Sequence, residues 1–157
     1  MTPGVALMVF TADCVPILLH DPIKGAIGAV HAGWRGTVSN IPGEAVRKMK
    51  SEFGCSPADI KAAIGPCISK CCYETGSDVA YALQQSIPGA ANECLTQQEE
   101  KYMVDLKKAN YHQLINAGVI NIVISDECTS CRSDKYWSHR VTNGQRGSQA
   151  ALIVIKD

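Results

Sequence analysis

The sequence predicts one α+β domain in which mixed β-sheets pack against helices. A length of 157 residues suits one compact domain with its own core. Apolar residues make up 46% and charged residues 19% of the chain, which favours a folded state over disorder. The expected strands and helices alternate without the strict rhythm of a parallel sheet, and several neighbouring strands are too close in sequence for a crossover helix.

Three strands are expected near the N-terminus. Continuous apolar runs at 5–11 and 15–19 predict buried strands, and a third strand is expected at 26–31. The segment DPIKG at 21–25 predicts a turn, because proline fixes φ and glycine tolerates a positive φ.

A helix is expected to follow this third strand and to end near Phe53 and Gly54. Its apolar residues recur with helical spacing, at Ile41, Ala45, Met49 and Phe53. Pro42 and Gly43 fall within this stretch, so we expect them to delay the start of the helix or to kink it.

The remaining elements follow the same mixed pattern. In chain order they are a short turn at 56–59, a strand at 60–64, helices at 77–87 and 105–117, and strands at 119–125 and 150–155. Asp105 is expected to cap the second of these helices.

Charge and hydropathy exclude some classes of partner. Lys and Arg total 15, as do Asp and Glu, so the net charge is zero and neither nucleic acid nor an anionic membrane is expected as a main partner. No apolar run approaches the roughly 20 residues that span a bilayer. Because no Lys or Arg precedes Lys24, a secretory signal is not expected, and the eight cysteines favour a cytoplasmic protein with reduced or metal-bound thiols.

Cys14 and His31 form the first candidate site, at the ends of two adjacent apolar strands. A tight turn between the strands would bring both side chains to the same end of a sheet. Thiolate sulfur and imidazole nitrogen suit Zn²⁺, and imidazole also accepts copper. From spacing alone, a buried and inert Cys14 is the better interpretation.

A glycine-containing turn forms the second candidate site. Gly33 and Gly36 allow a tight turn into a helix, whose first N–H groups lack partners and can bind an anion. Arg35 could add a bidentate contact to phosphate, and Arg140 could meet an anionic or polar group of a substrate. The alternative is that Trp34 packs in the core and that both arginines are solvated.

Clustered cysteines form the third candidate site. Cys67, Cys71 and Cys72, together with Cys128 and Cys131, contain enough thiols to close a structural zinc site with four thiolates. The spacing is irregular and no histidine accompanies the cluster, so ordinary core and loop cysteines are favoured.

Several short motifs together resemble those of one family. They are TADC at 11–14, VHAGWRG at 30–36, IGPCI at 64–68, CCYE at 71–74, CTSC at 128–131 and SHR at 138–140. In this order, over essentially the whole chain, they resemble the laccase-domain family of multicopper polyphenol oxidase-like proteins, of the purine nucleoside phosphorylase or peptidoglycan editing factor type. The resemblance favours a functional Cys14 and His31 over the inert alternative.

The resemblance implies a fold and an activity. The fold is an α+β arrangement similar to the deamidase domain of cytotoxic necrotizing factor toxins. The activity is that of a purine nucleoside phosphorylase with adenosine deaminase and methylthioadenosine phosphorylase activities, acting on a purine nucleoside and phosphate. Members of the family carry an earlier segment with a Gln-Val-His motif. This sequence lacks that motif, so we expect the chain to correspond to the C-terminal part of the family fold.

The resemblance also implies a zinc site, with copper as the alternative metal. Cys14 and His31 would be two ligands, and the histidine of the absent motif would be the third. Bound zinc would activate water or polarise the substrate. Asp13 would accept a proton or orient the site, which requires an irregular strand end because neighbours in an extended strand point to opposite faces. The residues expected to bind phosphate and substrate are Gly33, Gly36, Arg35 and Arg140.

Three other functions stay open. A metal-independent hydrolase would use Cys14 as nucleophile and His31 as base. A copper-dependent polyphenol oxidase would need more histidine ligands than the four in this chain. A truncated domain that only binds a nucleotide-like ligand or another chain is the third alternative, and a homo-oligomer is compatible with all of them.

Overall fold

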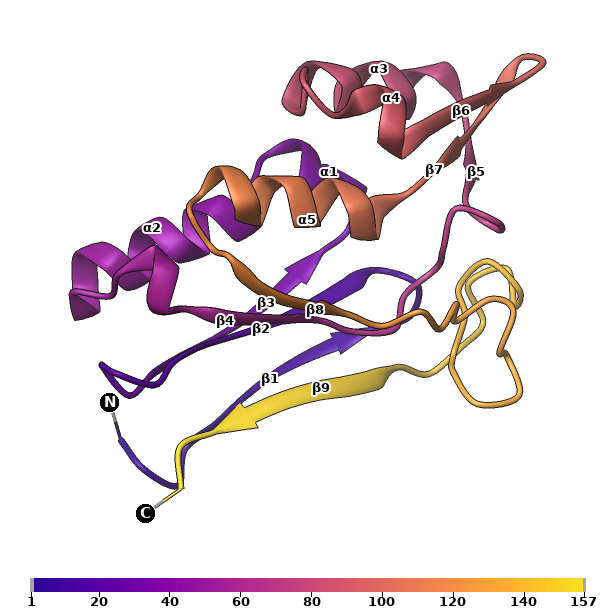
Figure 1. The fold of residues 1–157 in the computed structure, drawn as a ribbon. Helices are drawn as coiled ribbons and strands as arrows, with labels where there is room; N and C mark the ends of the chain where they lie inside the picture. Colours follow the sequence, from indigo (N-terminus) through magenta and orange to yellow (C-terminus); the bar gives the residue numbers. More distant parts are fainter. Residues whose placement is uncertain (1, 157) are drawn as a thin grey trace.

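The computed structural model describes residues 2–156 and has layers of sheet and helix (Figure 1). Its central sheet has four strands in the order β3–β2–β4–β8. They are β2 (Val15–Asp21), β3 (Ala26–Ala32), β4 (Lys61–Ile64) and β8 (Asn121–Ile124). Helices cover one face, and a pair formed by β1 (Ala6–Thr11) and β9 (Gln149–Val154) lies under the other. Because β2 is antiparallel to its neighbours while β4 and β8 are parallel, the predicted α+β class with mixed sheets is confirmed.

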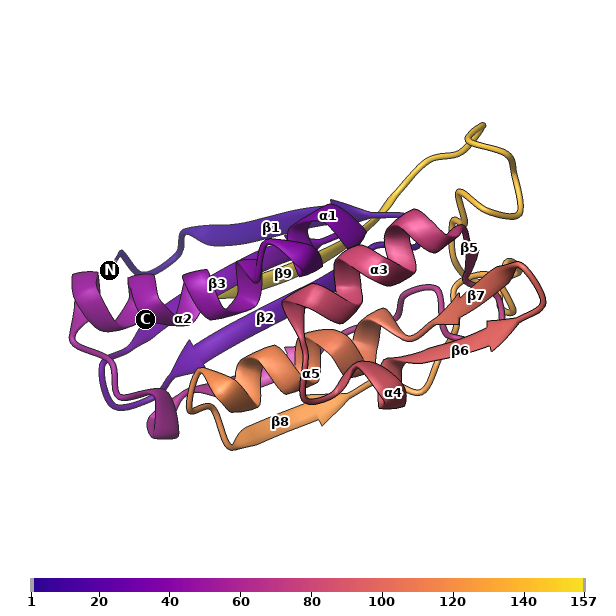
Figure 2. The same ribbon diagram turned by 90° about the horizontal axis from the view of Figure 1, so that it is seen from above.

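Three helices pack directly on the sheet. They are α1 (Trp34–Val38), α2 (Ile41–Phe53) and α5 (Leu106–Asn116). Viewed from above, α2 and α5 run side by side, and α3 (Ser77–Ser86) lies against α1 (Figure 2). Ile17 and Leu19 of β2 share one buried apolar cluster with Val46 of α2 and Leu114 of α5, so the core lies between sheet and helices. Among residues 2–156, no helix combines the length and the apolar character that a membrane span requires.

The predicted turn between β2 and β3 is confirmed. Asp21 Oδ1 accepts hydrogen bonds from the backbone N–H groups of Ile23 and Lys24, both at 2.9 Å. Gly25 has a φ of +63°, which side chains other than glycine rarely tolerate. The antiparallel register then places the start of β2 beside the end of β3, as the sequence predicts.

The sequence predicts one helix after the third strand, and the structure divides it. α1 and α2 are separated at Asn40, which has a left-handed φ of +54°. Pro42 lies in the first turn of α2, where its missing N–H costs no intrahelical hydrogen bond. The expected disturbance near Pro42 takes the form of a break at Asn40, rather than a late start or a kink at Pro42 and Gly43.

A second, smaller sheet was not predicted. It has the order β5–β7–β6, built from β5 (Glu74–Thr75), β6 (Leu95–Gln98) and β7 (Lys101–Val104), and the short helix α4 (Ala91–Cys94) precedes it. The chain around its tight turn reads TQQEEK, which lacks the glycine that usually marks a two-residue hairpin loop. Glu99 adopts a φ of +52° there instead.

Two burial predictions are wrong. The sequence predicts a buried β1, but Val5, Met8 and Phe10 are 46–59% exposed, since β1 pairs with β9 in a two-stranded sheet outside the main core. Phe53, on the expected apolar stripe, is 42% exposed because it is the last residue of α2.

A buried polar network joins α1 to α5. Asn110 Nδ2 donates to Thr37 Oγ1 at 3.0 Å and to the carbonyl of Leu106 at 2.7 Å. Gln113 Nε2 donates to the carbonyl of Thr37 at 2.6 Å, and Thr37 Oγ1 donates to the carbonyl of Gly33 at 3.1 Å. The network therefore fixes the short helix that begins after Gly33.

The network predicts the effect of Asn110→Ala. The change is expected to lower the free energy of unfolding by about 1–3 kcal/mol, because Thr37 Oγ1 loses its buried donor. Urea denaturation measures the difference. Asn116→Ala, at an exposed position of the same helix, should change it by less than about 0.5 kcal/mol. Equal losses in the two variants would contradict the role of the network.

Candidate functional site

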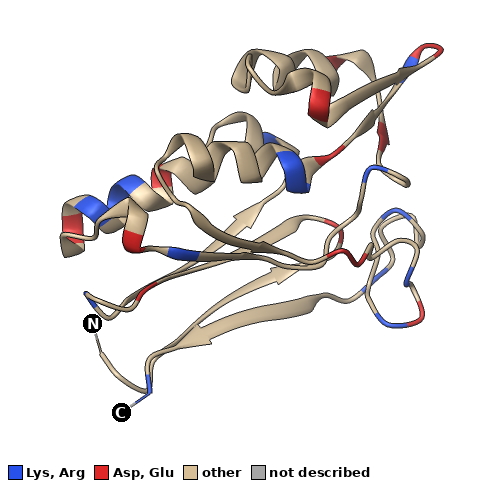
Figure 3. Cartoon of the chain, viewed as in Figure 1, with Lys and Arg blue, Asp and Glu red and all other residues tan. Residues whose placement is uncertain are grey.

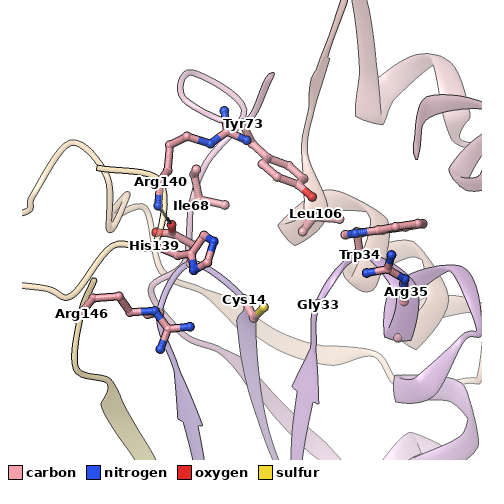
Figure 4. A pocket seen from close by; sticks show the side chains of 13 residues that line it. Cys14, Gly33, Trp34, Arg35, Ile68, Tyr73, Leu106, His139, Arg140 and Arg146 are labelled. Carbon is pink, nitrogen blue, oxygen red and sulfur yellow. Dashed lines mark hydrogen bonds between the residues drawn. The ribbon is translucent and has the colours of Figure 1, made fainter. Parts of the chain in front are cut away.

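A pocket of about 440 Å³ opens beside Cys14 (Figure 4). Its size lies within the range of roughly 300–1,000 Å³ that small-molecule sites occupy. Four segments that are distant in sequence supply most of its wall, at 12–14, 33–36, 68–73 and 139–146. The pocket thus collects most of the motifs that the sequence analysis singled out.

Asp13 anchors these segments to one another. Its φ of +78° gives the irregular strand end that its predicted role requires. The side chain is buried, and its Oδ1 accepts a hydrogen bond from Thr129 Oγ1 at 2.7 Å. Its Oδ2 accepts from Ser138 Oγ at 3.0 Å and from the backbone N–H of Arg140 at 2.7 Å. On the other side, its carbonyl accepts from the N–H of Ile68 at 3.0 Å.

The thiol of Cys14 lies at the centre of the pocket, next to Gly33 (Figure 4). Burial and the negative charge of Asp13 raise the pKa of Cys14, and the positive charge of Arg146 partly offsets them. A Cβ atom added to Gly33 would lie 3.1 Å from Cys14 Sγ. Glycine at position 33 therefore leaves the space that the sulfur occupies.

His31 does not line this pocket. It pairs with Pro16 on the edge strand β3, is exposed, and borders a separate hollow beside Ile41 and Glu44 of α2. Catalytic zinc normally takes three protein ligands. Cys14 and His31 lie at the same end of the β2–β3 hairpin, as the sequence predicts, but they face different hollows. Among residues 2–156 these two side chains alone do not make a three-ligand zinc site.

Positive charge prevails in the pocket, since three arginines and one carboxylate line it. The guanidinium of Arg35 lies 4.3 Å from the centroid of the Trp34 ring. Arg146 lies in the C-terminal loop, residues 125–148 between β8 and β9, and its Nη1 donates to Ser148 Oγ at 3.1 Å. This loop carries several of the basic segments in Figure 3. An anion would find complementary charge in this pocket.

Arg140 is held by backbone carbonyls. Its Nη1 donates to the carbonyl of Cys72 at 3.2 Å, and its Nη2 donates to that of Glu74 at 2.9 Å. The guanidinium also lies 5.5 Å from the centroid of the Tyr73 ring, whose hydroxyl points into the pocket (Figure 4). Burial raises the pKa of Tyr73 to about 12, so that hydroxyl stays a hydrogen-bond donor at neutral pH.

Gly33 and Gly36 both line the pocket, but the predicted tight turn before the helix is wrong, because Gly36 lies inside α1. Gly33 instead precedes the first residue of the helix, with an ordinary φ of −73°. The helix that follows it is short, because α1 ends at Val38. Gly36 is packed closely, since a Cβ atom there would lie 3.4 Å from Ile41 Cγ2. Arg35 is exposed and projects from α1 beside the pocket.

Sequence reasoning missed three residues of the site. His139 lines the pocket beside Cys14, and Thr129 and Ser138 hold the carboxylate of Asp13. All three fall within the CTSC and SHR motifs, which marked the segments but not the roles. The hydrogen bonds from Thr129 and Ser138 to Asp13 join residues 116 and 125 positions apart, and a single sequence carries no signal for such pairings.

Comparison with known proteins places these features in a wider group. The family model described as multi-copper polyphenol oxidoreductase laccase matches residues 1–156. The purine nucleoside phosphorylase YlmD of Geobacillus stearothermophilus is 41% identical over 96% of this chain and 56% of its own length. Human purine nucleoside phosphorylase LACC1 is 33% identical over 98% of this chain and 36% of its own length. The crystal structure of the Bacillus licheniformis hypothetical protein YfiH has a TM-score of 0.96 at 34% identity, over 99% of this chain and 59% of that one.

The chain therefore spans little more than half the length of these bacterial relatives. The likeness in structure extends over the central sheet, its helices and the pocket segments, since nearly all of the chain is covered.

The anchoring role of Asp13 predicts the effect of Asp13→Asn. The free energy of unfolding is expected to fall by about 1.5–3 kcal/mol, because hydrogen bonds to a charged acceptor are lost. Asparagine tolerates a positive φ, so the change tests the hydrogen bonds rather than the backbone. Urea denaturation and the rate of proteolysis in the C-terminal loop are the measurements. Asp126→Asn, at an exposed position, is the matched control, and an equal effect there would contradict the anchor.

Proposed function

Because the chain belongs to the multi-copper polyphenol oxidoreductase laccase family, we propose that the pocket at Cys14 is a purine nucleoside phosphorylase site. In this reaction a phosphate oxygen attacks C1′ of the ribose, and the bond from C1′ to the purine nitrogen breaks. The products are a free purine base and ribose 1-phosphate. The observation that carries the proposal is a single pocket that combines aromatic walls with three arginines.

The aromatic side chains suit the purine. Trp34 and Tyr73 line the pocket from opposite segments, and Ile68 and Leu106 add apolar surface between them. A flat heterocycle gains both burial and ring contacts in such a site. The hydroxyl of Tyr73, which stays protonated at neutral pH, is the proposed donor to a ring nitrogen or carbonyl.

The arginines suit the phosphate. Arg35 and Arg146 line the pocket from different segments, and charge-assisted hydrogen bonds to phosphate oxygens are strong. The first backbone N–H groups of α1, after Gly33, are the proposed further donors. His139 is the proposed carrier of the proton that the departing base takes up.

Asp13 and Arg140 are proposed as positioning residues. The carboxylate of Asp13 accepts three hydrogen bonds, so its assigned role is to orient the site rather than to accept a proton. Arg140 supports the wall at Tyr73 through its contacts with the carbonyls of Cys72 and Glu74.

A zinc ion at Cys14 and His31 is an additional part of this proposal. Cys14 and His31 are proposed as two ligands, with the third supplied from outside this sequence, as the family resemblance implies. When bound, zinc would lower the pKa of bound water or polarise the substrate, and copper is the alternative metal. Because two ligands do not complete the site, no step above depends on the metal.

A metal-independent hydrolase has less support. It was expected to use His31 as base, but His31 borders another hollow, and His139 is the imidazole in the pocket of Cys14. Burial also raises the pKa of the Cys14 thiol, which disfavours the thiolate nucleophile. A cytoplasmic location agrees with eight free thiols and belongs to the same proposal. A homo-oligomer is a further part of the proposal, and sedimentation of the purified protein would measure the oligomeric state.

The proposed activity predicts phosphate-dependent release of base. Purified protein incubated with inosine or adenosine and phosphate should yield free base and ribose 1-phosphate, measured by chromatography, and none without phosphate. Methylthioadenosine should react in the same way. Deamination of adenosine should instead release ammonia without phosphate, so the two activities are separable. Absence of turnover with and without added Zn²⁺ would contradict an active phosphorylase and favour a binding domain.

The pocket arginines predict a selective loss. Arg35→Gln should lower kcat/KM about tenfold or more, chiefly through the KM for phosphate, because a charge-assisted contact contributes about 1.5–3 kcal/mol. The control is Arg47→Gln, which removes an exposed arginine of α2 outside the pocket. Equal kinetic constants for the two variants would contradict phosphate binding at Arg35.

A further inference from the structure

Four thiols that are far apart in sequence meet at the rim of the fold. Cys71 and Cys72 come from one segment, and Cys128 and Cys131 come from another. Their four sulfur atoms all lie within 4.8 Å of one another. Among residues 2–156 the structure shows this one group of three or more Cys, His, Asp or Glu side chains close enough to share an ion.

The backbone explains why the two segments meet. β4 and β8 pair in parallel up to Ile64 and Ile124, and the pairing resumes as a bridge between Cys67 and Cys128. The chain from Cys67 and the chain from Cys128 therefore leave the same edge of the sheet in the same direction. Cys71 and Cys72, which follow Cys67, therefore come close to Cys128 and Cys131.

The distances between the sulfur atoms match a four-thiolate metal site. Tetrahedral zinc with Zn–S bonds of about 2.3 Å requires sulfur atoms about 3.8 Å apart. Cys71 Sγ lies 3.7 Å from Cys72 Sγ and 3.6 Å from Cys131 Sγ, and Cys72 Sγ lies 3.3 Å from Cys131 Sγ. A disulfide requires about 2.05 Å, and all eight cysteines are free.

Hydrogen bonds hold the chain around the cluster. The backbone N–H of Ser69 donates to Cys128 Sγ at 3.3 Å, the kind of contact that orients and stabilises a ligating thiolate. The largely buried Lys107 donates from Nζ to the carbonyls of Ser125 and Glu127, at 2.9 and 2.7 Å, and so holds the chain that leads into Cys128.

We propose that Cys71, Cys72, Cys128 and Cys131 bind one structural Zn²⁺ ion, separate from the pocket at Cys14. Four thiolates leave no open position, so this zinc takes no part in chemistry. Its binding displaces the thiol protons to solvent and links the segment before Tyr73 to the C-terminal loop. The carbonyl of Cys72 accepts from Arg140, and Thr129 accompanies Cys128, so the metal steadies the pocket wall from outside.

The first test is metal content. Protein purified under reducing conditions with added Zn²⁺ is expected to retain about one equivalent of tightly bound zinc after desalting, measured by mass spectrometry of the metal. The double variant Cys71→Ser/Cys131→Ser changes two exposed residues and should lose it, with an affinity at least 100-fold lower in competition with a chelating dye. Circular dichroism is the check that the double variant remains folded.

The matched control is Cys14→Ser, which removes the thiol of the other candidate site. It should retain the tight zinc, because Cys14 is not part of the cluster. Loss of zinc in Cys14→Ser but not in the double variant would assign the metal to the pocket and overturn the proposal. This result does not depend on whether the protein is a phosphorylase, because no activity is measured.

The second test identifies the ligands. Cobalt substituted for zinc should give the intense visible bands of a tetrahedral thiolate site in the wild type and in Cys14→Ser, and not in the double variant. Chelation should lower the melting temperature of the wild type but not that of the double variant. Zinc-free wild type, or a disulfide between Cys72 and Cys131 found by mass spectrometry of protein kept reduced, would overturn the proposal.

Discussion

The carboxylate of Asp13 holds together parts of the chain that regular secondary structure leaves apart. Residues 125–148, between β8 and β9, form no helix and no regular strand. Ordering the backbone of such a stretch costs about 1–2 kcal/mol per residue, and few of its side chains are buried apolar groups. Thr129, Ser138 and the N–H of Arg140 converge instead on one buried acceptor. The position of His139 in the pocket depends on that convergence.

A second constraint is the parallel pairing of β4 and β8. Parallel neighbours require a long connection, and here it runs through α3, the small sheet and α5. The connection returns the chain beside residues 61–64, so the IGPCI and CTSC motifs leave the sheet together. Tyr73 and Arg140 then meet as a consequence of this topology, and neither local propensity nor motif spacing encodes the meeting directly.

Local chemistry determined how much of this could be predicted. The strands of the central sheet, the turn at Asp21 and the cap at Asp105, which accepts from the N–H of Lys108 at 2.9 Å, follow from apolar runs and well-known capping residues. The β6–β7 hairpin lacked a turn signal, and the exposure of β1 depends on what packs outside it. Cys14 lies immediately before β2, at the strand end where the sequence places it, and Gly33 beside its thiol is near in sequence. His139 and Arg146 of the same pocket come from more than 100 positions away.

Strand pairing also explains why Cys14 and His31, the two expected zinc ligands, face different hollows. The pocket receives Cys14, Arg35 and His139, whereas His31 lies on the free edge of β3. An edge strand presents unpaired backbone groups and invites pairing with a further segment. The bacterial relatives are longer than this chain, which covers 56–59% of their length. The chain thus supplies a positively charged pocket at Cys14, and His31, at the same end of the β2–β3 hairpin, lies outside it.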